Sequence, residues 1–147
     1  MNLENHVPSL ETCKRMKELG WIKECLFQWG RYYDWQWDAF GESTDKKKYD
    51  EDYEVEMADN LPDHLYFEKE SQAQLLSEIL EELPENIKFG GVTYGLQLYK
   101  NDEGYYIEYI QWLNDQAHRH CFSLSSAEAA ALLWIKLREE GIIPSNA

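Results

Sequence analysis

Four aromatic side chains in the first third of the chain have the spacing that stacking chemistry needs. Tyr32, Tyr33, Trp35 and Trp37 lie close together, and Tyr33, Trp35 and Trp37 alternate with polar residues. A period of two places alternate side chains on one face of a strand. Rings on one face can stack on a base, a sugar or a cationic side chain. The same rings can instead cover a sheet, because aromatic residues favour strands.

Four carboxylates follow at alternate positions, namely Asp50, Asp52, Glu54 and Glu56. The spacing resembles part of a calcium-binding loop, but such a loop needs a fixed glycine and a glutamate at its twelfth position. No glycine lies between Asp50 and Glu56, so the pattern favours a solvated acidic loop and we assign no metal. Residues 41–60 lack the apolar side chains whose burial would offset the conformational entropy lost on ordering, which predicts a mobile acidic loop there.

The densest group of other metal-capable side chains is His118, His120 and Cys121. Two histidines two positions apart share one face of a strand, but zinc needs three or four ligands and no partner spacing supplies them. We interpret these residues as ordinary strand residues. No G-x-S-x-G elbow surrounds a serine, and no Gly-Lys-Ser/Thr follows Gly90-Gly91. We therefore assign no catalytic residue and no cofactor, although carboxylates with a divalent metal remain an alternative.

Local patterns predict the strands that hold the aromatic residues. Residues 25–29 and 33–39 alternate as two strands, with Gly30 as a bend or bulge between them. Residues 87–113 form further strands around a hairpin turn at 100–104, where Gly104 can adopt a positive φ. Shorter strands are expected at 64–67 and 118–122.

Three helices are expected from capping residues and apolar periodicity. Ser9 caps a helix over Ser9–Leu19, which Gly20 ends. Ser71 caps a second helix, which Pro84 ends. Ser125 and Glu128 form a capping box for the last helix, with Gly141 after its end. The order helix, strands, helix, strands, helix predicts one α+β domain over residues 1–147, an antiparallel sheet covered by about three helices.

Composition and charge indicate which kinds of partner and which cellular compartment to expect. The chain has 28 acidic and 14 basic residues, a net charge of −14, which opposes direct binding to nucleic acid phosphates. Such a charge suits a basic protein partner, or it only maintains solubility. The sequence shows no membrane-length apolar run and no signal peptide. Cys13, Cys25 and Cys121 are odd in number and widely spaced, as expected of reduced thiols in a cytoplasmic protein.

Ser9–Gly20 followed by Leu26-Phe27-Gln28-Trp29 is similar to a "SLELCKxLKELG" helix and an "LFYW" strand that are typical of a family of small uncharacterised phage and prophage proteins. Leu75–Glu85 resembles its "ELxExLPE" helix, and Ala127–Ile143 its closing helix. The resemblance implies a phage or prophage origin and therefore a bacterial host cytoplasm. It implies no activity and transfers no site residues.

Three hypotheses follow. The first is a phage accessory protein that binds a basic host or phage protein, with its acidic surface imitating nucleic acid. The second is a binder of a nucleotide-like ligand, with Trp29, Tyr33, Trp35 and Trp37 as an aromatic platform. The third is a metal-dependent hydrolase that uses clustered carboxylates. The sequence leaves the oligomeric state open.

Overall fold

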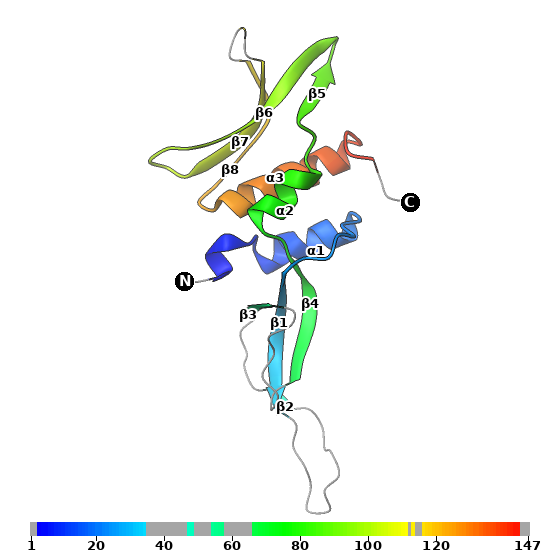
Figure 1. Cartoon of the computed structure of the whole chain (residues 1–147), viewed down its shortest axis with the longest axis vertical. Helices are drawn as coiled ribbons and strands as arrows, with labels where there is room; N and C mark the ends of the chain where they lie inside the picture. The colour runs from blue at the N-terminus through cyan, green and yellow to red at the C-terminus, as the bar shows by residue number, and fades with distance from the viewer. Residues whose placement is uncertain are drawn as a thin grey trace, which may run out of the picture.

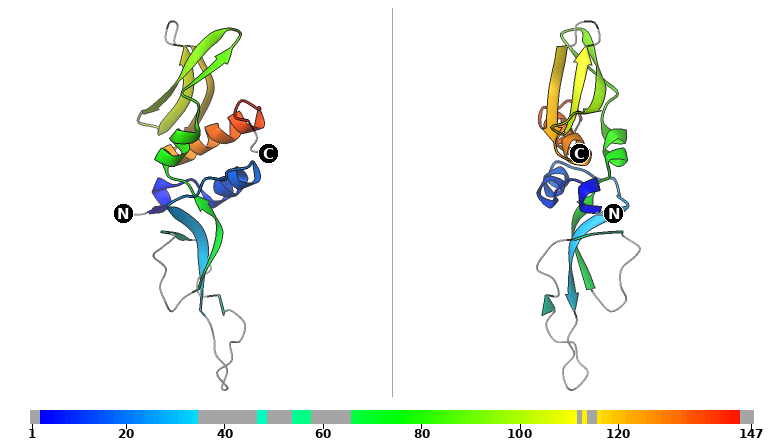
Figure 2. Two further views of the ribbon diagram at one scale, coloured as in Figure 1. Left: turned by 45° about the vertical axis from the view of Figure 1, so that its right-hand side comes forward. Right: turned by 90° about the vertical axis from the view of Figure 1, so that its left-hand side faces the viewer.

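The computed structural model describes residues 3–34, 47–48, 54–57, 66–111, 113 and 116–144. Within these residues the chain forms three α-helices and two antiparallel sheets, which confirms the predicted α+β class. The strands form two sheets rather than the single sheet expected. The helices lie in a layer between them, so that the two sheets occupy opposite ends of the molecule (Figures 1 and 2).

The first sheet is built around β1 (Phe27–Asp34). Along one edge β1 pairs with β4 (Tyr66–Ala73), and along the other with β3 (Glu54–Met57) and β2 (Lys47–Lys48). The register shifts between Trp29 and Gly30, where Trp29 pairs with Ser71 and Gly30 with Lys69. The irregularity is therefore next to Gly30 as predicted, but the extra residue is Glu70 of β4 and not the glycine.

The prediction of a separate strand starting at Tyr33 is wrong, because β1 continues to Asp34 without a turn. Residues 31–34 contain no turn-forming pair that would reverse the chain, and β1 stays paired with β4 as far as Tyr33. Residues 35–39 of that predicted strand lie outside the described residues. In the segment predicted as a mobile loop, residues 47–48 and 54–57 are the strands β2 and β3, and its remaining residues also lie outside the described part.

A short 3₁₀ helix, η1 (Leu3–His6), precedes α1 (Leu10–Glu18). Ser9 caps α1 as predicted, because its hydroxyl accepts a hydrogen bond from the Thr12 N–H at 3.3 Å. The face of α1 that contains Cys13 packs beside β1 and β4. There it contributes to a small core of Val7, Cys13, Phe27, Trp29, Val55 and Ala73.

The second helix, α2 (Leu76–Glu82), begins later than predicted. Ser71 is not its cap but a buried residue of β4 that pairs with Trp29 of β1. Strand pairing continues to Ala73, and the helix begins where the Glu78 carboxylate accepts a hydrogen bond from the Leu75 N–H at 2.7 Å. The predicted end before Pro84 is confirmed.

The second sheet has the order β5 (Asn86–Phe89), β6 (Val92–Lys100), β7 (Tyr105–Gln111) and β8 (Gln116–Ser123), all antiparallel. The predicted hairpin joins β6 to β7, and Gly104 has φ +154°. A Cβ on Gly104 would lie 2.7 Å from the Phe122 ring and 2.8 Å from the Ser123 carbonyl oxygen, so glycine is also required sterically.

The last helix, α3 (Ser126–Glu139), packs on β7, β8, α1 and α2. Ser125 caps it as predicted, because its hydroxyl accepts a hydrogen bond from the Glu128 N–H at 3.4 Å. The predicted capping box is not complete, since the Ser125 N–H donates to the Ser123 hydroxyl at 3.3 Å and not to the Glu128 carboxylate. That carboxylate reaches instead to the start of α1, where it accepts hydrogen bonds from the Ser9 N–H at 2.7 Å and from the Thr12 hydroxyl. One carboxylate thus ties the N-terminal ends of α1 and α3 together.

A large core fills the space between the helices and the second sheet. Its fully buried members include Met16, Ile79, Ile107, Tyr109 and Leu133. Burial raises the pKa of the Tyr109 hydroxyl, which donates a hydrogen bond to the Pro84 carbonyl at 2.6 Å. Among the described residues, no helix is both long enough and apolar enough to span a membrane.

Candidate binding site

The turn after α1 depends on a glycine. Gly20 has φ +96°, and its N–H donates to the Lys17 carbonyl at 3.1 Å. The Trp21 N–H donates to the Met16 carbonyl at 2.9 Å, which completes a C-terminal capping motif. A Cβ on Gly20 would lie 2.7 Å from Nη2 of Arg138. Glycine is therefore needed here for its backbone angle and to admit the Arg138 side chain.

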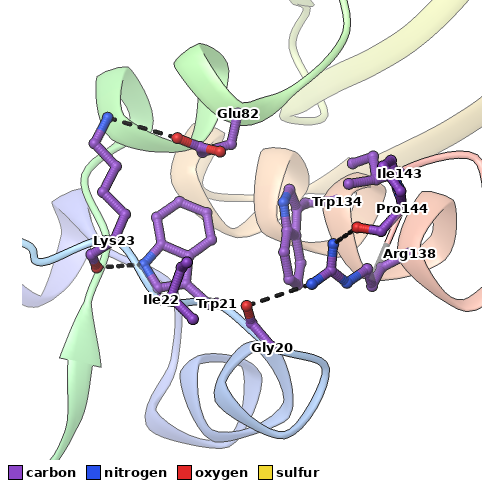
Figure 3. Close-up of a pocket in the computed structure, with 9 residues that line it drawn as sticks. All are labelled: Gly20, Trp21, Ile22, Lys23, Glu82, Trp134, Arg138, Ile143 and Pro144. Carbon is purple, nitrogen blue, oxygen red and sulfur yellow. Dashed lines mark hydrogen bonds and ion pairs between the residues drawn. The ribbon is translucent and has the colours of Figure 1, made fainter. Parts of the chain in front are cut away.

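This turn forms one wall of an open cavity of about 540 Å³, which is within the range of small-molecule sites, roughly 300–1,000 Å³. Side chains from α2, α3 and the segment after α3 form the other walls (Figure 3). The lining residues are Gly20, Trp21, Ile22, Lys23, Glu82, Trp134, Arg138, Ile143 and Pro144. The cavity thus combines two indole rings, aliphatic side chains and three ionisable groups.

Arg138 is the most informative of these residues, because its side chain is only 8% exposed. Its Nε donates to the Leu19 carbonyl at 2.7 Å, its Nη2 to the Gly20 carbonyl at 3.4 Å, and its Nη1 to the Pro144 carbonyl. No carboxylate of the described residues lies within ion-pair distance. Among the described residues, the groups that stabilise the guanidinium are therefore neutral: the three backbone carbonyls and the Trp134 ring.

The two indole rings meet edge to face inside the cavity. The Trp21 and Trp134 ring centres are 5.4 Å apart at an interplanar angle of 68°. The Trp21 Nε1–H donates to the Lys23 carbonyl at 2.8 Å, and the Arg138 guanidinium lies 5.3 Å from the centre of the Trp134 ring. These contacts fix both rings, so the cavity is largely preformed. Ile22 at its mouth is 75% exposed and offers apolar surface to a ligand.

The Lys23 ammonium is already neutralised within the protein. It forms an ion pair with Glu81 and lies 3.9 Å from a Glu82 carboxylate oxygen. The hydrogen bond to Glu81 raises the pKa of Lys23, so the group is charged at neutral pH. The cation in the cavity without an acidic partner in the described structure is Arg138.

The residues of the predicted aromatic platform do not come together at this cavity. Trp29 is 7% exposed and belongs to the small core, where its Nε1–H donates to the Pro8 carbonyl at 3.0 Å. Trp29 is therefore a structural residue. Tyr32 and Tyr33 lie in β1, but their side chains are outside the described part of the structure, as are Trp35 and Trp37 entirely.

Of the predicted acidic residues, Glu54 and Glu56 lie in β3, next to β1. Glu56 is partly buried, whereas Asp50 and Asp52 fall outside the described residues. The acidic face of α2 is largely used within the protein. Glu78 accepts hydrogen bonds from the N–H groups of Leu75 and Leu26, and its neighbours Glu81 and Glu82 neutralise Lys23.

A bulge in β8 separates the two histidines that were expected to share a face. The register shifts beside Arg119, which has φ +53°. His118 packs against Phe89 and Tyr94 on the helix-facing side, while His120 stacks on Tyr106 on the other. In the described part of the chain no three His, Cys, Asp or Glu side chains are grouped to hold a metal ion.

The thiols are not poised for nucleophilic chemistry. All three cysteines are free, and Cys13 and Cys25 are buried. Desolvation raises the pKa of Cys13 and of Cys25 to about 12, so both are neutral thiols at neutral pH. The thiolate is the nucleophile, and these groups do not supply it.

Sequence reasoning missed two arrangements. One is the contact between Arg138 and Trp134. Residues four apart share one face of a helix, and a cation in the last turn is favoured by the helix dipole, so the sequence contained a signal for this pair. The other is a row of rings in contact on the outer face of the second sheet, with two stacked pairs and one tilted pair, where ring centres are 4.8–5.6 Å apart. Its members are Tyr99, Tyr106, His120 and Phe122.

Comparison with known proteins adds no relative, because no family model, no curated protein and no solved structure matches this chain.

Proposed function

We propose that this protein binds a small ligand that carries an aromatic ring and an anionic group, of which a nucleotide is the class to test first. The ligand would occupy the cavity formed by the turn after α1, α2 and α3. The observation that carries the proposal is Arg138, a guanidinium that is 8% exposed, lines an open cavity and contacts no carboxylate among the described residues.

A buried charge is costly unless it is paired, and neutral carbonyls compensate it only in part. A guanidinium has five N–H donors, and three hydrogen bonds from Arg138 are accounted for. An anionic group in the cavity would supply the missing charge and accept the remaining N–H groups. The competing explanation is that Arg138 only fastens the end of α1 to the segment after α3.

The apolar walls favour an aromatic ligand over a bare anion. Trp21 and Trp134 line the cavity with the small part of their surface that stays exposed, 7% and 3% of each residue, and a ligand that covered Ile22 would remove an exposed aliphatic side chain from water. Each 100 Å² of apolar surface that is buried contributes about 2.5 kcal/mol. This term is added to the charge interaction, so a nucleotide should bind more tightly than either its nucleoside or phosphate alone.

The test is a tryptophan fluorescence titration with matched ligands: the four nucleoside monophosphates, the four nucleosides and ribose 5-phosphate. We expect at least one nucleotide to change the emission and to bind at least ten times more tightly than its nucleoside. Arg138→Met should abolish this difference, and Arg138→Lys should retain part of it. Trp29→Phe, which removes a tryptophan of the small core, should leave the affinity unchanged.

If Arg138→Met does not fold, Ile22→Ser is the second variant, since Ile22 is exposed at the mouth of the cavity. It should weaken nucleotide binding several-fold without altering the melting temperature. Equal affinity for nucleotide and nucleoside, or no response to any ligand, would contradict the proposal.

A second function is favoured by the distribution of charge. Residues 35–65 contain ten acidic and three basic residues, which is half of the net charge of −14. The strands on either side of this segment pair at Tyr33 and Tyr66, at the end of the β1–β4 pair that points away from the helices (Figure 1). We propose that this acidic segment binds a basic protein, and that it can imitate nucleic acid in doing so.

This second proposal is tested with two variants of equal charge. One carries Asp50→Asn, Asp52→Asn, Glu54→Gln and Glu56→Gln; the control carries Glu81→Gln, Glu82→Gln, Glu139→Gln and Glu140→Gln. Bacterial proteins captured by the wild type at low salt should be lost from the first variant and retained by the control. Capture that resists high salt, or equal loss from both variants, would count against it.

We further propose a phage or prophage origin and a bacterial host cytoplasm. The resemblance of the Ser9–Gly20 helix to phage proteins supports the origin, and the three free thiols agree with a reducing compartment. Fractionation of a bacterium that carries the gene would test the location. Recovery from the periplasm would contradict it.

A further inference from the structure

A second, smaller recess lies beside the first cavity and shares Trp21, Ile22 and Lys23 with it. Its volume is about 160 Å³. The polar side chains that line it come from three parts of the chain: Lys17 from α1, Lys23 from the turn after α1, and Lys69, Ser71, Gln72 and Gln74 from β4 and the residue after it. The recess therefore combines three ammonium groups, one hydroxyl and two amides with the apolar surface of Trp21 and Ile22.

Two of these side chains have polar atoms without a partner. Ser71 is 1% exposed and Gln74 is not exposed, yet the Ser71 hydroxyl and both polar atoms of the Gln74 amide make no hydrogen bond in the described structure. Gln72 differs, because its amide oxygen accepts a hydrogen bond from the Cys25 N–H at 3.1 Å. Buried polar groups in folded proteins are nearly always paired, so these orphaned atoms indicate a missing partner.

The three lysines indicate the charge of that partner. The chain has only 14 basic residues against 28 acidic ones, yet three line this one recess. Lys23 is paired with Glu81 and Glu82, whereas Lys17 and Lys69 make no ion pair with another described residue. Each ammonium has three N–H donors and no acceptor. Like charges around one space repel each other unless an anion lies between them.

We propose that this recess binds a phosphate-type oxoanion. Lys17 and Lys69 would neutralise its charge, and the Ser71 hydroxyl and the Gln74 amide N–H groups would donate hydrogen bonds to its oxygens. A tetrahedral oxoanion accepts several hydrogen bonds at once, as this donor set requires. Because Ser71 and Gln74 have almost no accessible surface, the anion reaches them after a small movement of the flexible side chains that line the recess.

The proposal does not depend on the ligand of the first cavity, since the orphaned atoms and the unpaired lysines belong to this recess alone. The competing explanation is that ordered water satisfies Ser71 and Gln74, since buried water commonly pairs such groups. Water would satisfy the orphaned atoms without any preference for phosphate over chloride.

The test is thermal unfolding in inorganic phosphate and in chloride at equal ionic strength and pH. At one hundred times the dissociation constant, specific binding should raise the melting temperature by about 5–10 °C. Lys69→Gln should weaken phosphate binding at least ten-fold, and Ser71→Ala should weaken it several-fold. Lys88→Gln, an exposed lysine in the other sheet, is the matched control and should keep the full shift.

Arg138→Lys separates the two sites, because it should weaken binding in the first cavity and leave the phosphate shift unchanged. Three results would overturn the proposal. One is an equal melting temperature in phosphate and chloride, which would mean a hydrated recess only. Another is an equal loss of the shift in Lys69→Gln and Lys88→Gln, which would mean general screening. The third is a Ser71→Ala protein with an unchanged phosphate shift.

Discussion

The small core beside β1 and the large core under the second sheet differ in size and in what they hold together. Among the described residues, six buried side chains form the small core and fifteen form the large one. The aromatic stretch that is prominent in the sequence supplies the small core with Phe27 and Trp29. The first cavity lies at the edge of the large core, beside Trp21 and Trp134, and the second recess lies between Trp21 of the large core and the residues around Ala73 of the small core. Prominent aromatic residues can thus have a structural role, while the candidate sites form elsewhere.

The largest expected effect comes from a cavity-forming substitution in each core, because the two substitutions should differ in how much of the molecule they open to hydrogen exchange. Leu133→Ala leaves a hole in the large core and should lower the free energy of unfolding by about 2–5 kcal/mol. Hydrogen exchange should then accelerate throughout the molecule. Val55→Ala in the small core should accelerate exchange in β1 and β4 and leave α3 and β7 protected, because the smaller core can open locally. Uniform acceleration in both variants would mean a single cooperative core.

Glu128 joins the two regions, so its replacement has the next largest expected effect. Glu128→Gln weakens the charge-assisted hydrogen bonds to the Ser9 N–H and the Thr12 hydroxyl, which should cost about 1.5–3 kcal/mol. Urea unfolding measures the change. Glu85→Gln, at an exposed position after α2, is the control and should alter stability by less than about 0.5 kcal/mol. An equally small effect of Glu128→Gln would show that the hydrogen bonds from Ser9 and Thr12 to Glu128 do not stabilise the fold.

Gly20→Ala tests the turn after α1, which forms one wall of the first cavity. The positive φ is strained for alanine, which should lower the free energy of unfolding by about 1–2 kcal/mol. The new Cβ would lie 2.7 Å from Arg138 Nη2, and this close contact should lower it further. Gly91→Ala is a matched control, because Gly91 has φ +80° and open space around it. The difference between the two melting temperatures reports the contact with Arg138. Equal shifts would mean that Arg138 moves away without cost.

The smallest effect concerns the thiols, one in each core. Cys13 and Cys25 both have a pKa of about 12, so at pH 8 neither should react with a disulfide reagent in the native protein. In dilute urea Cys13, in the small core, should react before Cys25, in the large core. The raised pKa values also mean that native stability is retained below pH 9 and falls between pH 9 and 12, by about 1.4 kcal/mol per pH unit for each thiol. Simultaneous labelling of Cys13 and Cys25 would contradict the difference between the cores.

Much of the fold could be predicted from local sequence. Ser9, Ser125, Gly20, Gly141 and Pro84 marked helix ends correctly, because capping and chain termination depend on the few residues at each end. The start of α2 was wrong because the pairing of Ser71 with Trp29 across the sheet overrides a local capping signal. The division into two sheets was also missed, since alternation predicts a strand but not its partners.

The candidate sites could not be predicted in the same way. Gly20, Lys23, Lys69, Trp134 and Arg138 are far apart in sequence and each has an ordinary local role. Only the packing of α1 against α3 brings the Arg138 guanidinium to the Gly20 carbonyl, 118 residues away. The bulge at Arg119 likewise overrode the period of two that placed His118 and His120 on one face.

The central claim is that ligands bind beside Trp21 and Trp134 and not along the aromatic stretch of β1. Six tryptophans give six indole N–H signals in a nitrogen–proton correlation spectrum, and single Trp→Phe variants assign them. During titration with the best nucleotide, we expect the Trp21 and Trp134 signals to move together and saturably while the Trp29 signal stays in place. Movement of the Trp29 signal with no change at Trp21 and Trp134 would contradict the account.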